Sequence, residues 1–140
     1  MSQQTAHEHN KAVQSVRPKD HTATVNGVGV NRLGFREALI KLSIGAVSGT
    51  TPTLDAKVQE SDDDSTYVDI TGAVFTQKVA ADANKIFVGR IWLEARKKFV
   101  RVVYTIGGTT PSFGGCSDIV LSNADKRPVG QDQTLGFNVQ

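Results

Sequence analysis

The sequence predicts an all-β domain, and the types of its apolar residues carry that prediction. Of the 140 residues, 17 are Val, 7 are Ile and 13 are Thr, whereas Leu and Met together number only 8. Because β-branched side chains fit a pleated sheet and lose rotamer freedom in a helix, this balance favours strands. Thirteen glycines supply turns and argue against a helical bundle. The length corresponds to a single domain.

The first strand patterns begin near residue 22. Residues 22–31 are rich in β-formers but are broken by Gly27 and Gly29, which predicts a bent strand. Residues 35–47 place alternate apolar side chains on one face, and a Ser-Gly-Thr-Thr-Pro turn follows. Residues 54–58 then alternate apolar and polar side chains, as a strand with one buried face does.

Further strands follow along the rest of the chain. Residues 86–93 are apolar on both faces, which predicts a central strand. Residues 109–115 are rich in glycine and contain a proline, which predicts a loop. The remaining elements are strands over residues 67–75, 99–106, 119–121 and 135–139, and one helical turn over residues 80–85. Seven or eight strands separated by turns suit a β-sandwich, jelly-roll or immunoglobulin-like, with a small barrel as the alternative.

The chain is predicted to divide into an extended N-terminal arm over residues 1–24 and a β-sandwich domain over residues 25–140. Val13 and Val16 are the large apolar residues that stand out in the first segment. Such a segment buries too little surface to offset the entropy lost on ordering. We expect either an unordered terminus or an arm that orders on a partner.

Residues that could support catalysis or hold a metal are few. His7, His9 and His21 are the three histidines, and a two-ligand site in the arm would have to order the chain. Cys116 lies in a Gly-Gly-Cys-Ser-Asp segment that resembles a nucleophile turn, but no histidine follows His21 to act as its base. Two carboxylates brought together by the fold stay open as an acid–base pair, although nothing in the sequence favours them. We therefore expect no enzyme activity, no metal and no cofactor.

The formal net charge of +2 conceals two opposed blocks. Residues 55–69 hold six acids and one lysine, whereas residues 90–101 hold five bases and one glutamate. The blocks are either solvated hairpin tips or surfaces complementary to a protein partner, whose orientation they would fix. The small basic excess argues against a nucleic-acid partner. No run approaches the ~20 apolar residues of a membrane span, so we expect no membrane partner either.

One combination of motifs has a counterpart in a known family. Residues 54–70 give an alternating strand, an Asp-rich turn and a strand containing Tyr-Val-Asp-Ile, and Arg-Lys-Lys-Phe-Val-Arg at 96–101 opens a strand that ends in Gly-Gly. This pattern, over roughly residues 35–110, resembles the head decoration proteins, or capsid cement proteins, of tailed phages. The resemblance implies a jelly-roll-like sandwich that bridges major capsid protein subunits on the outside of an icosahedral head, as a homodimer. It brings no catalytic residues.

For such a protein, the arm and the two charge blocks suggest where the capsid is contacted, since the arm would order along neighbouring subunits and the blocks would fix the orientation. The candidate capsid-binding residues are Arg17, Lys19, Arg96, Lys97, Lys98 and Arg101, and Asp62, Asp63 and Asp64 form a possible second contact patch. The expected location is the outer surface of the phage head, after synthesis in the bacterial cytoplasm. The alternative function is that of a carbohydrate-binding jelly-roll module of a virion appendage. Such modules expose aromatic rings to sugars, whereas most of the 9 aromatic residues fall on core-facing or ambiguous positions.

Overall fold

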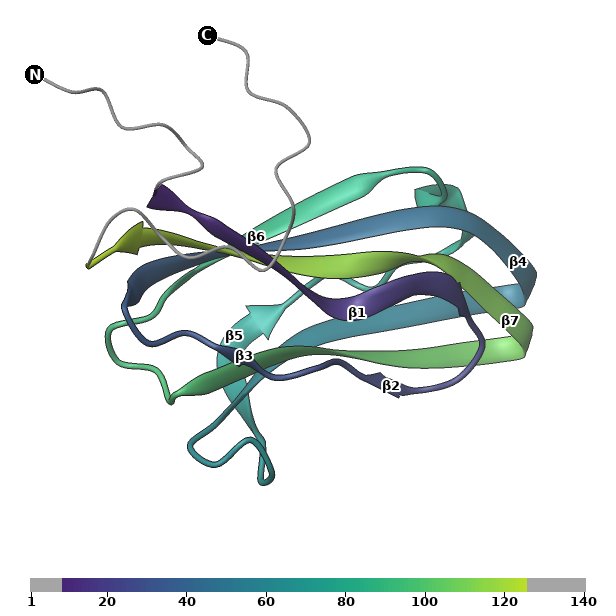
Figure 1. Ribbon diagram of the computed structural model, residues 1–140. Coiled ribbons are helices and arrows are strands. Elements are labelled where there is room, and N and C mark those ends of the chain that lie inside the picture. The colour runs from purple at the N-terminus through teal and green to yellow at the C-terminus, as the bar shows by residue number, and fades with distance from the viewer. Residues whose placement is uncertain (1–8, 126–140) are drawn as a thin grey trace, which may run out of the picture.

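The structure, a computed structural model, describes residues 9–125 and confirms an all-β fold (Figure 1). A 3-10 turn, η1 (Ala80–Asp82), lies within the predicted helical turn. The predicted strand over residues 135–139 lies outside the described residues. Within the described part of the chain, no helix has the length and apolar character needed to cross a membrane. The strands are β1 (Lys11–His21), β2 (Val25–Asn26), β3 (Val30–Asn31), β4 (Phe35–Ser61), β5 (Val68–Val74), β6 (Ile86–Trp92) and β7 (Phe99–Ala124).

Two long strands, β4 and β7, pass through both layers of a sandwich. The first half of β4 pairs with the second half of β7 and with β6, and its second half pairs with the first half of β7 and with β5. One layer, the β6 layer, therefore has the order β1-β7-β4-β6, and the other, the β5 layer, has the order β5-β4-β7 followed by β2 and β3. This is the strand order of an eight-stranded jelly roll, as predicted. β4 and β7 each correspond to two successive strands of that fold, joined without a loop.

The same four residues, Gly-Thr-Thr-Pro, bend both long strands. Gly49 has φ 108° and Gly108 has φ 111°, conformations that favour glycine. A Cβ atom on Gly49 would lie 2.6 Å from the carbonyl oxygen of Thr110, and one on Gly108 would lie 2.7 Å from that of Thr51. The absence of a side chain on each glycine thus leaves room for the backbone at the bend of the other long strand. The loop predicted over residues 109–115 is wrong beyond this bend, because the rest of it continues in β7.

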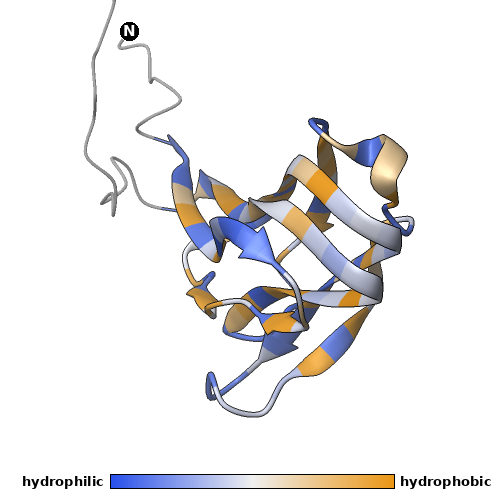
Figure 2. Cartoon of the chain, turned by 90° about the vertical axis from the view of Figure 1, so that its right-hand side faces the viewer, coloured by the Kyte–Doolittle hydropathy of each residue, from blue (hydrophilic) through white to orange (hydrophobic). Residues whose placement is uncertain are grey.

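The core lies between the two layers and receives side chains from both. The Tyr104 and Ser117 hydroxyls are 2.5 Å apart in the interior, and burial raises the pKa of Tyr104, which keeps the phenol neutral. Hydrophobic and polar residues alternate along the strands (Figure 2), as a sheet with one buried face requires. Side chains at most 1% exposed include Ile40, Leu42, Ile119 and Leu121 of the β6 layer and Leu54, Val100, Val102 and Tyr104 of the β5 layer.

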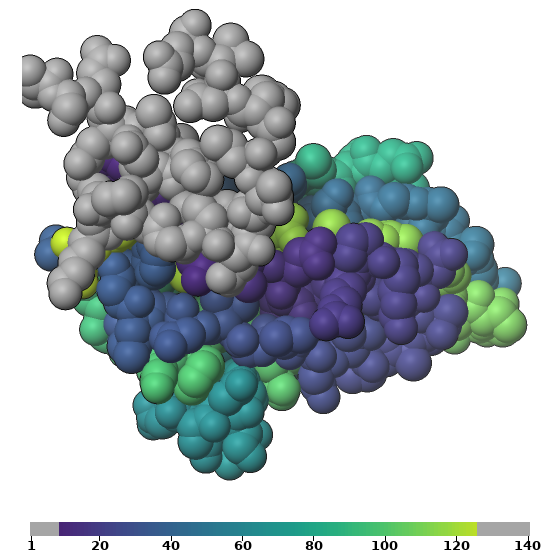
Figure 3. Space-filling model, in the orientation of Figure 1, coloured from purple at the N-terminus to yellow at the C-terminus, as the bar shows by residue number. Residues whose placement is uncertain are grey.

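The predicted arm over residues 1–24 is in large part a strand of the sandwich. β1 pairs with the second half of β7, and Val16 is only 1% exposed. Figure 3 shows β1, in purple, lying across the face of the molecule. Within the described residues, most of the predicted arm is therefore a sheet strand rather than a free segment.

Buried polar residues explain why the sequence pattern did not predict β1 as a strand of the sandwich. The Ser15 hydroxyl donates to the carbonyl oxygen of Val28 at 3.0 Å and accepts from the backbone N–H of Val102 at 2.9 Å. The ring of His21 is buried, and its Nε2 lies 3.1 Å from two backbone carbonyl oxygens. Because buried polar groups are tolerated when they are hydrogen-bonded, a strand poor in large apolar residues still joins the core.

Candidate docking surface

β6 is an edge strand, whereas its sequence predicted a central one. Among the described residues it pairs with β4 alone. Its alternate residues Ile86, Val88 and Trp92 are 60%, 60% and 57% exposed. Leu39, on the neighbouring β4, is 38% exposed and lies opposite Arg90 of β6. We call Leu39, Ile86, Val88 and Trp92 the β6 face, with Arg90 exposed between Val88 and Trp92; clusters of exposed apolar side chains are typical of interaction sites.

Charged and amide groups surround the tryptophan. The Arg90 guanidinium lies 4.7 Å from the centre of the Trp92 ring, as in a cation–π contact. Glu37 forms an ion pair with Arg90 Nε at 3.1 Å and accepts a hydrogen bond from Asn123 Nδ2 at 3.0 Å. An aromatic side chain with an arginine beside it is the composition that binding hot spots favour.

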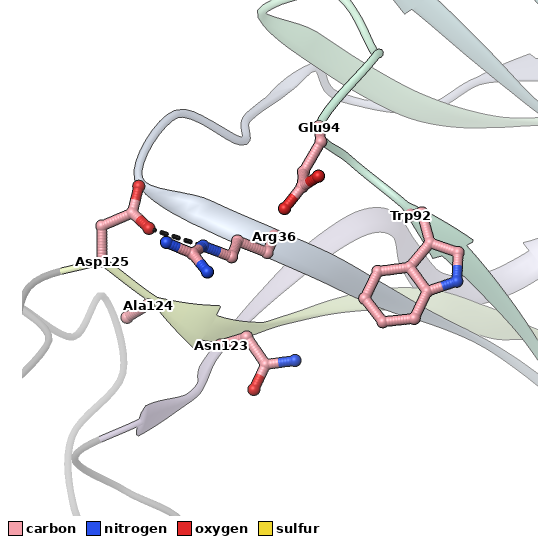
Figure 4. A pocket seen from close by; sticks show the side chains of 6 residues that line it. All are labelled: Arg36, Trp92, Glu94, Asn123, Ala124 and Asp125. Atoms are coloured by element: carbon pink, nitrogen blue, oxygen red, sulfur yellow. Dashed lines mark hydrogen bonds and ion pairs between the residues drawn. The ribbon is translucent and has the colours of Figure 1, made fainter.

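An open polar pocket of about 610 Å³ adjoins Trp92 at the end of the β6 layer. Figure 4 shows its lining, with Arg36 and Asp125 joined by an ion pair of 2.9 Å and Glu94 between them and the indole. Asn123, near the end of β7, also lines the pocket. The pocket therefore offers hydrogen-bonding groups beside an aromatic ring.

The acidic and basic blocks lie against each other. The end of β4 pairs with the start of β7, which brings the two blocks together, and Figure 3 shows green residues lying against the projecting teal loop that follows β4. Lys97 Nζ is 2.9 Å from Asp62 Oδ2, and this contact raises the pKa of Lys97. Arg96 pairs with Glu60 at 3.5 Å. Much of the charge predicted to meet a partner is thus neutralised within the chain.

Asp63 and Asp64 stabilise the loop after β4. The carboxylate of Asp63 accepts from the backbone N–H groups of Thr66 at 2.9 Å and of Ser65 at 3.0 Å. These bonds lower the pKa of Asp63 to about 2. Asp64 accepts a hydrogen bond from the hydroxyl of Tyr67, whose pKa burial and this bond raise to about 12.

The other predicted contact residues do not form one patch. Arg101 lies 3.9 Å from the ring centre of Tyr67 and donates to the side chain of Gln59. Lys98 is exposed and takes part in none of the ion pairs found within residues 9–125. Arg17 and Lys19 are exposed on β1, in the other layer from the start of β7. The capsid contacts assigned to these residues stay predictions.

Cys116 lies within β7 opposite Ser43, not in a turn. Burial raises the pKa of its thiol, which favours the unreactive neutral form. In the part of the chain that the structure describes, no group of three or more His, Cys, Asp and Glu side chains could hold a metal ion. His7 lies outside the described residues.

The β6 face is the feature that the sequence did not reveal. Its signal was present, since residues 86–93 are apolar on both faces, but that pattern also fits a central strand. Strand pairing decides between the two cases, and it places one of the two apolar faces in solvent.

Comparison with known proteins gives weak likenesses. No family model matches the sequence, and no curated protein matches it. Among solved structures, the SPBc2 prophage-derived protein YomS is 14% identical, with 81% of this chain and 95% of that chain covered and a TM-score of 0.45. A protein of the Bacillus endospore appendages, described as a family of disulfide-linked pili, is 19% identical, with coverages of 87% and 97% and a TM-score of 0.39. Likenesses of this strength carry no argument about function.

Proposed function

We propose that the chain is a structural virion protein that binds the outside of an icosahedral phage head and cements neighbouring major capsid protein subunits through the β6 face. The observation that carries the proposal is the row of Ile86, Val88 and Trp92, each more than half exposed on a single edge strand. The sequence resemblance to tailed-phage cement proteins supplies the partner, and within that family we propose the cement protein of a Bordetella podovirus as the counterpart of this chain.

The energetics of such a surface suit a cement protein. Full burial of a large apolar side chain contributes about 1.5–3 kcal/mol, of which association consumes a substantial part. One modest contact suffices when a molecule touches several subunits, because linked contacts raise the overall affinity. We propose a homodimer as the attached unit, which mass photometry of the free protein would test. This function uses no catalytic group, cofactor, nucleic acid or membrane.

Replacement of Val88 by Gln tests the proposal. Purified protein is added to heads that lack it, and the bound copies are counted against protein concentration. We expect Val88→Gln to weaken binding at least tenfold, about 1.4 kcal/mol, because the face loses apolar surface at its centre. Val68→Gln is the matched control, since Val68 is 47% exposed on β5. Equal binding by wild type and Val88→Gln would refute docking through the β6 face.

Carbohydrate binding is the second candidate, and the pocket beside Trp92 favours it. An exposed indole next to carboxylate, guanidinium and amide groups matches the needs of a sugar, with an apolar C–H face and hydroxyls. A glycan array with wild type and Asn123→Ala would separate the two functions. Glycan binding that Asn123→Ala abolishes, together with no binding to heads, would favour the carbohydrate function.

A further inference from the structure

The sandwich is open between the edge strands β5 and β6. A cleft of about 380 Å³ lies there and reaches core side chains. A Cβ atom on Gly89 of β6 would lie 3.6 Å from the ring of Phe75, so the cleft is narrow at this point. Its apolar lining includes Ile40, Val58, Phe75, Phe87 and Ile91.

A buried lysine projects into this cleft. Lys78 is only 7% exposed, and its Nζ lies 3.7 Å from the centre of the Phe87 ring. Its backbone N–H and C=O both bond to Leu54, at 2.8 and 2.9 Å, which fixes its position. No carboxylate lines the cleft, and the ion pairs found within residues 9–125 do not include Lys78.

Such a lysine costs stability that a methionine would not. The side chain is buried, and within residues 9–125 the ammonium lies over the Phe87 ring without an ion-pair partner. A Met side chain would fill the same space without a charge. Residues that are suboptimal for stability are often retained for function, so the charge points to an anionic group that enters the cleft.

The strand edges define what kind of molecule carries that group. Within the described residues, β5 and β6 each pair with β4 alone, so each keeps one free edge at the cleft. Free edges offer backbone N–H and C=O groups to an extended chain. A small apolar acid would use the cleft and Lys78 but not these edges.

We infer that the cleft binds an extended peptide segment of a partner, which pairs with a strand edge, inserts apolar side chains and places a carboxylate on Lys78. Arg90 also lines the cleft, but its guanidinium is paired with Glu37, so Lys78 is the cation proposed to hold the carboxylate. The inference deepens the proposed function and rests on it for the partner's identity, a capsid subunit. The recognition chemistry itself, an acidic residue within an apolar strand, comes from the cleft alone.

The test uses the full chain and a library of nine-residue peptides that alternate apolar residues and Thr around a central Glu, with Gln at the centre as control. We expect wild type to bind the best Glu peptide at least tenfold more tightly than its Gln counterpart. Lys78→Met should abolish that preference, whereas Lys85→Met, an exposed lysine outside the cleft, should keep it. Bound peptide should also slow hydrogen exchange at β5 or β6 amides. No binding, or no preference for Glu, would overturn the inference.

Two further measurements separate the alternatives. Thermal unfolding should show Lys78→Met to be at least as stable as wild type, because a buried side chain whose charge has no ion-pair partner is replaced by an apolar one, so lost binding cannot come from misfolding. Octanoate that binds with Lys78 dependence, while no peptide protects β5 or β6 amides, would make the cleft a small-acid site and reject the peptide.

Binding to heads distinguishes failure of this inference from failure of the proposed function. If Lys78→Met binds heads like wild type while Trp92→Ala, at a residue outside the cleft lining, does not, docking through the β6 face is supported and the cleft is not the contact. If wild type prefers Glu peptides through Lys78 yet does not bind heads, peptide binding in the cleft is supported and the proposed capsid cementing is refuted.

Discussion

The outer faces of the two layers are built on the same pleated pairing, yet they differ in how their side chains meet solvent. On the β5 layer Val74 is 62% exposed, but its outward neighbours are polar and bond to one another: Lys57 Nζ and Gln59 Nε2 contact the carboxylate of Asp69 at 3.0 and 2.8 Å, and Arg101 donates to Gln59. On the β6 layer Ile86 and the rest of the β6 face are exposed and apolar. Polar side chains that bond to one another are stable in contact with solvent, whereas burial of exposed apolar side chains against a partner lowers the free energy.

The largest expected effect concerns the β6 face. Trp92→Ala should weaken binding to heads about thirtyfold, near 2 kcal/mol, because a large aromatic anchor is lost. Its unfolding free energy should change by less than ~0.5 kcal/mol, since the indole is exposed. Head-binding titrations and urea unfolding measure the two quantities.

Trp92 is also the chain's single tryptophan, so its emission reports on this face alone. Wild-type emission should shift to the blue when heads are added. If Trp92→Ala instead lost stability and bound heads as well as wild type, the indole would serve folding rather than binding, and the prediction would be wrong.

The next effect concerns the β5 layer. Gln59→Ala removes the acceptor of two Arg101 hydrogen bonds, at 3.0 and 2.8 Å, and a donor to Asp69. We expect unfolding in urea to become easier by about 1 kcal/mol, with head binding unchanged. The comparison variant for both measurements is Lys41→Ala, which truncates a polar side chain on the outward side of β4 in the β6 layer. Weaker head binding by Gln59→Ala would make the polar face an interface too.

The smallest effect is a pH dependence at the end of the β5 layer. Backbone hydrogen bonds, chiefly from Thr66, lower the pKa of Asp63 from 3.8 to about 2. A lowered pKa stabilises the folded state fully above pH 3.8, and this contribution disappears as the pH falls towards 2. An NMR titration of the carboxyl carbon should give a midpoint near 2, and Asp63→Asn should flatten the stability profile between those values. A midpoint near 3.8 would show that the loop does not hold the carboxylate.

Sequence patterns predicted elements well where one side of a strand is apolar and turns are marked. Residues 35–47 and 54–58 are correctly extended, and the Gly-Thr-Thr-Pro turn between them is the observed bend. The hydropathy pattern did not predict that β1 belongs to the sheet. Its buried residues Ser15 and His21 are polar, and the hydrogen bonds that accommodate them do not show in such a pattern.

The candidate site was predicted less well than the fold. The charge blocks were recognised in the sequence, but their mutual pairing, such as Lys97 with Asp62, joins residues 35 positions apart. The cleft at Lys78 is lined by residues of two edge strands, β5 and β6, which the fold brings to the same opening.

The sequence by itself determined the strand content, the two glycine-marked bends and the apolar character of residues 86–93, because alternation and turn chemistry act between near neighbours. The tertiary structure alone decided which of those strands became edges. Strand order depends on long-range pairing, and that pairing left Val88 and Trp92 in solvent while it buried Lys78 beside an aromatic ring. The surfaces proposed to bind a partner therefore follow from topology acting on side chains whose chemistry was readable from the start.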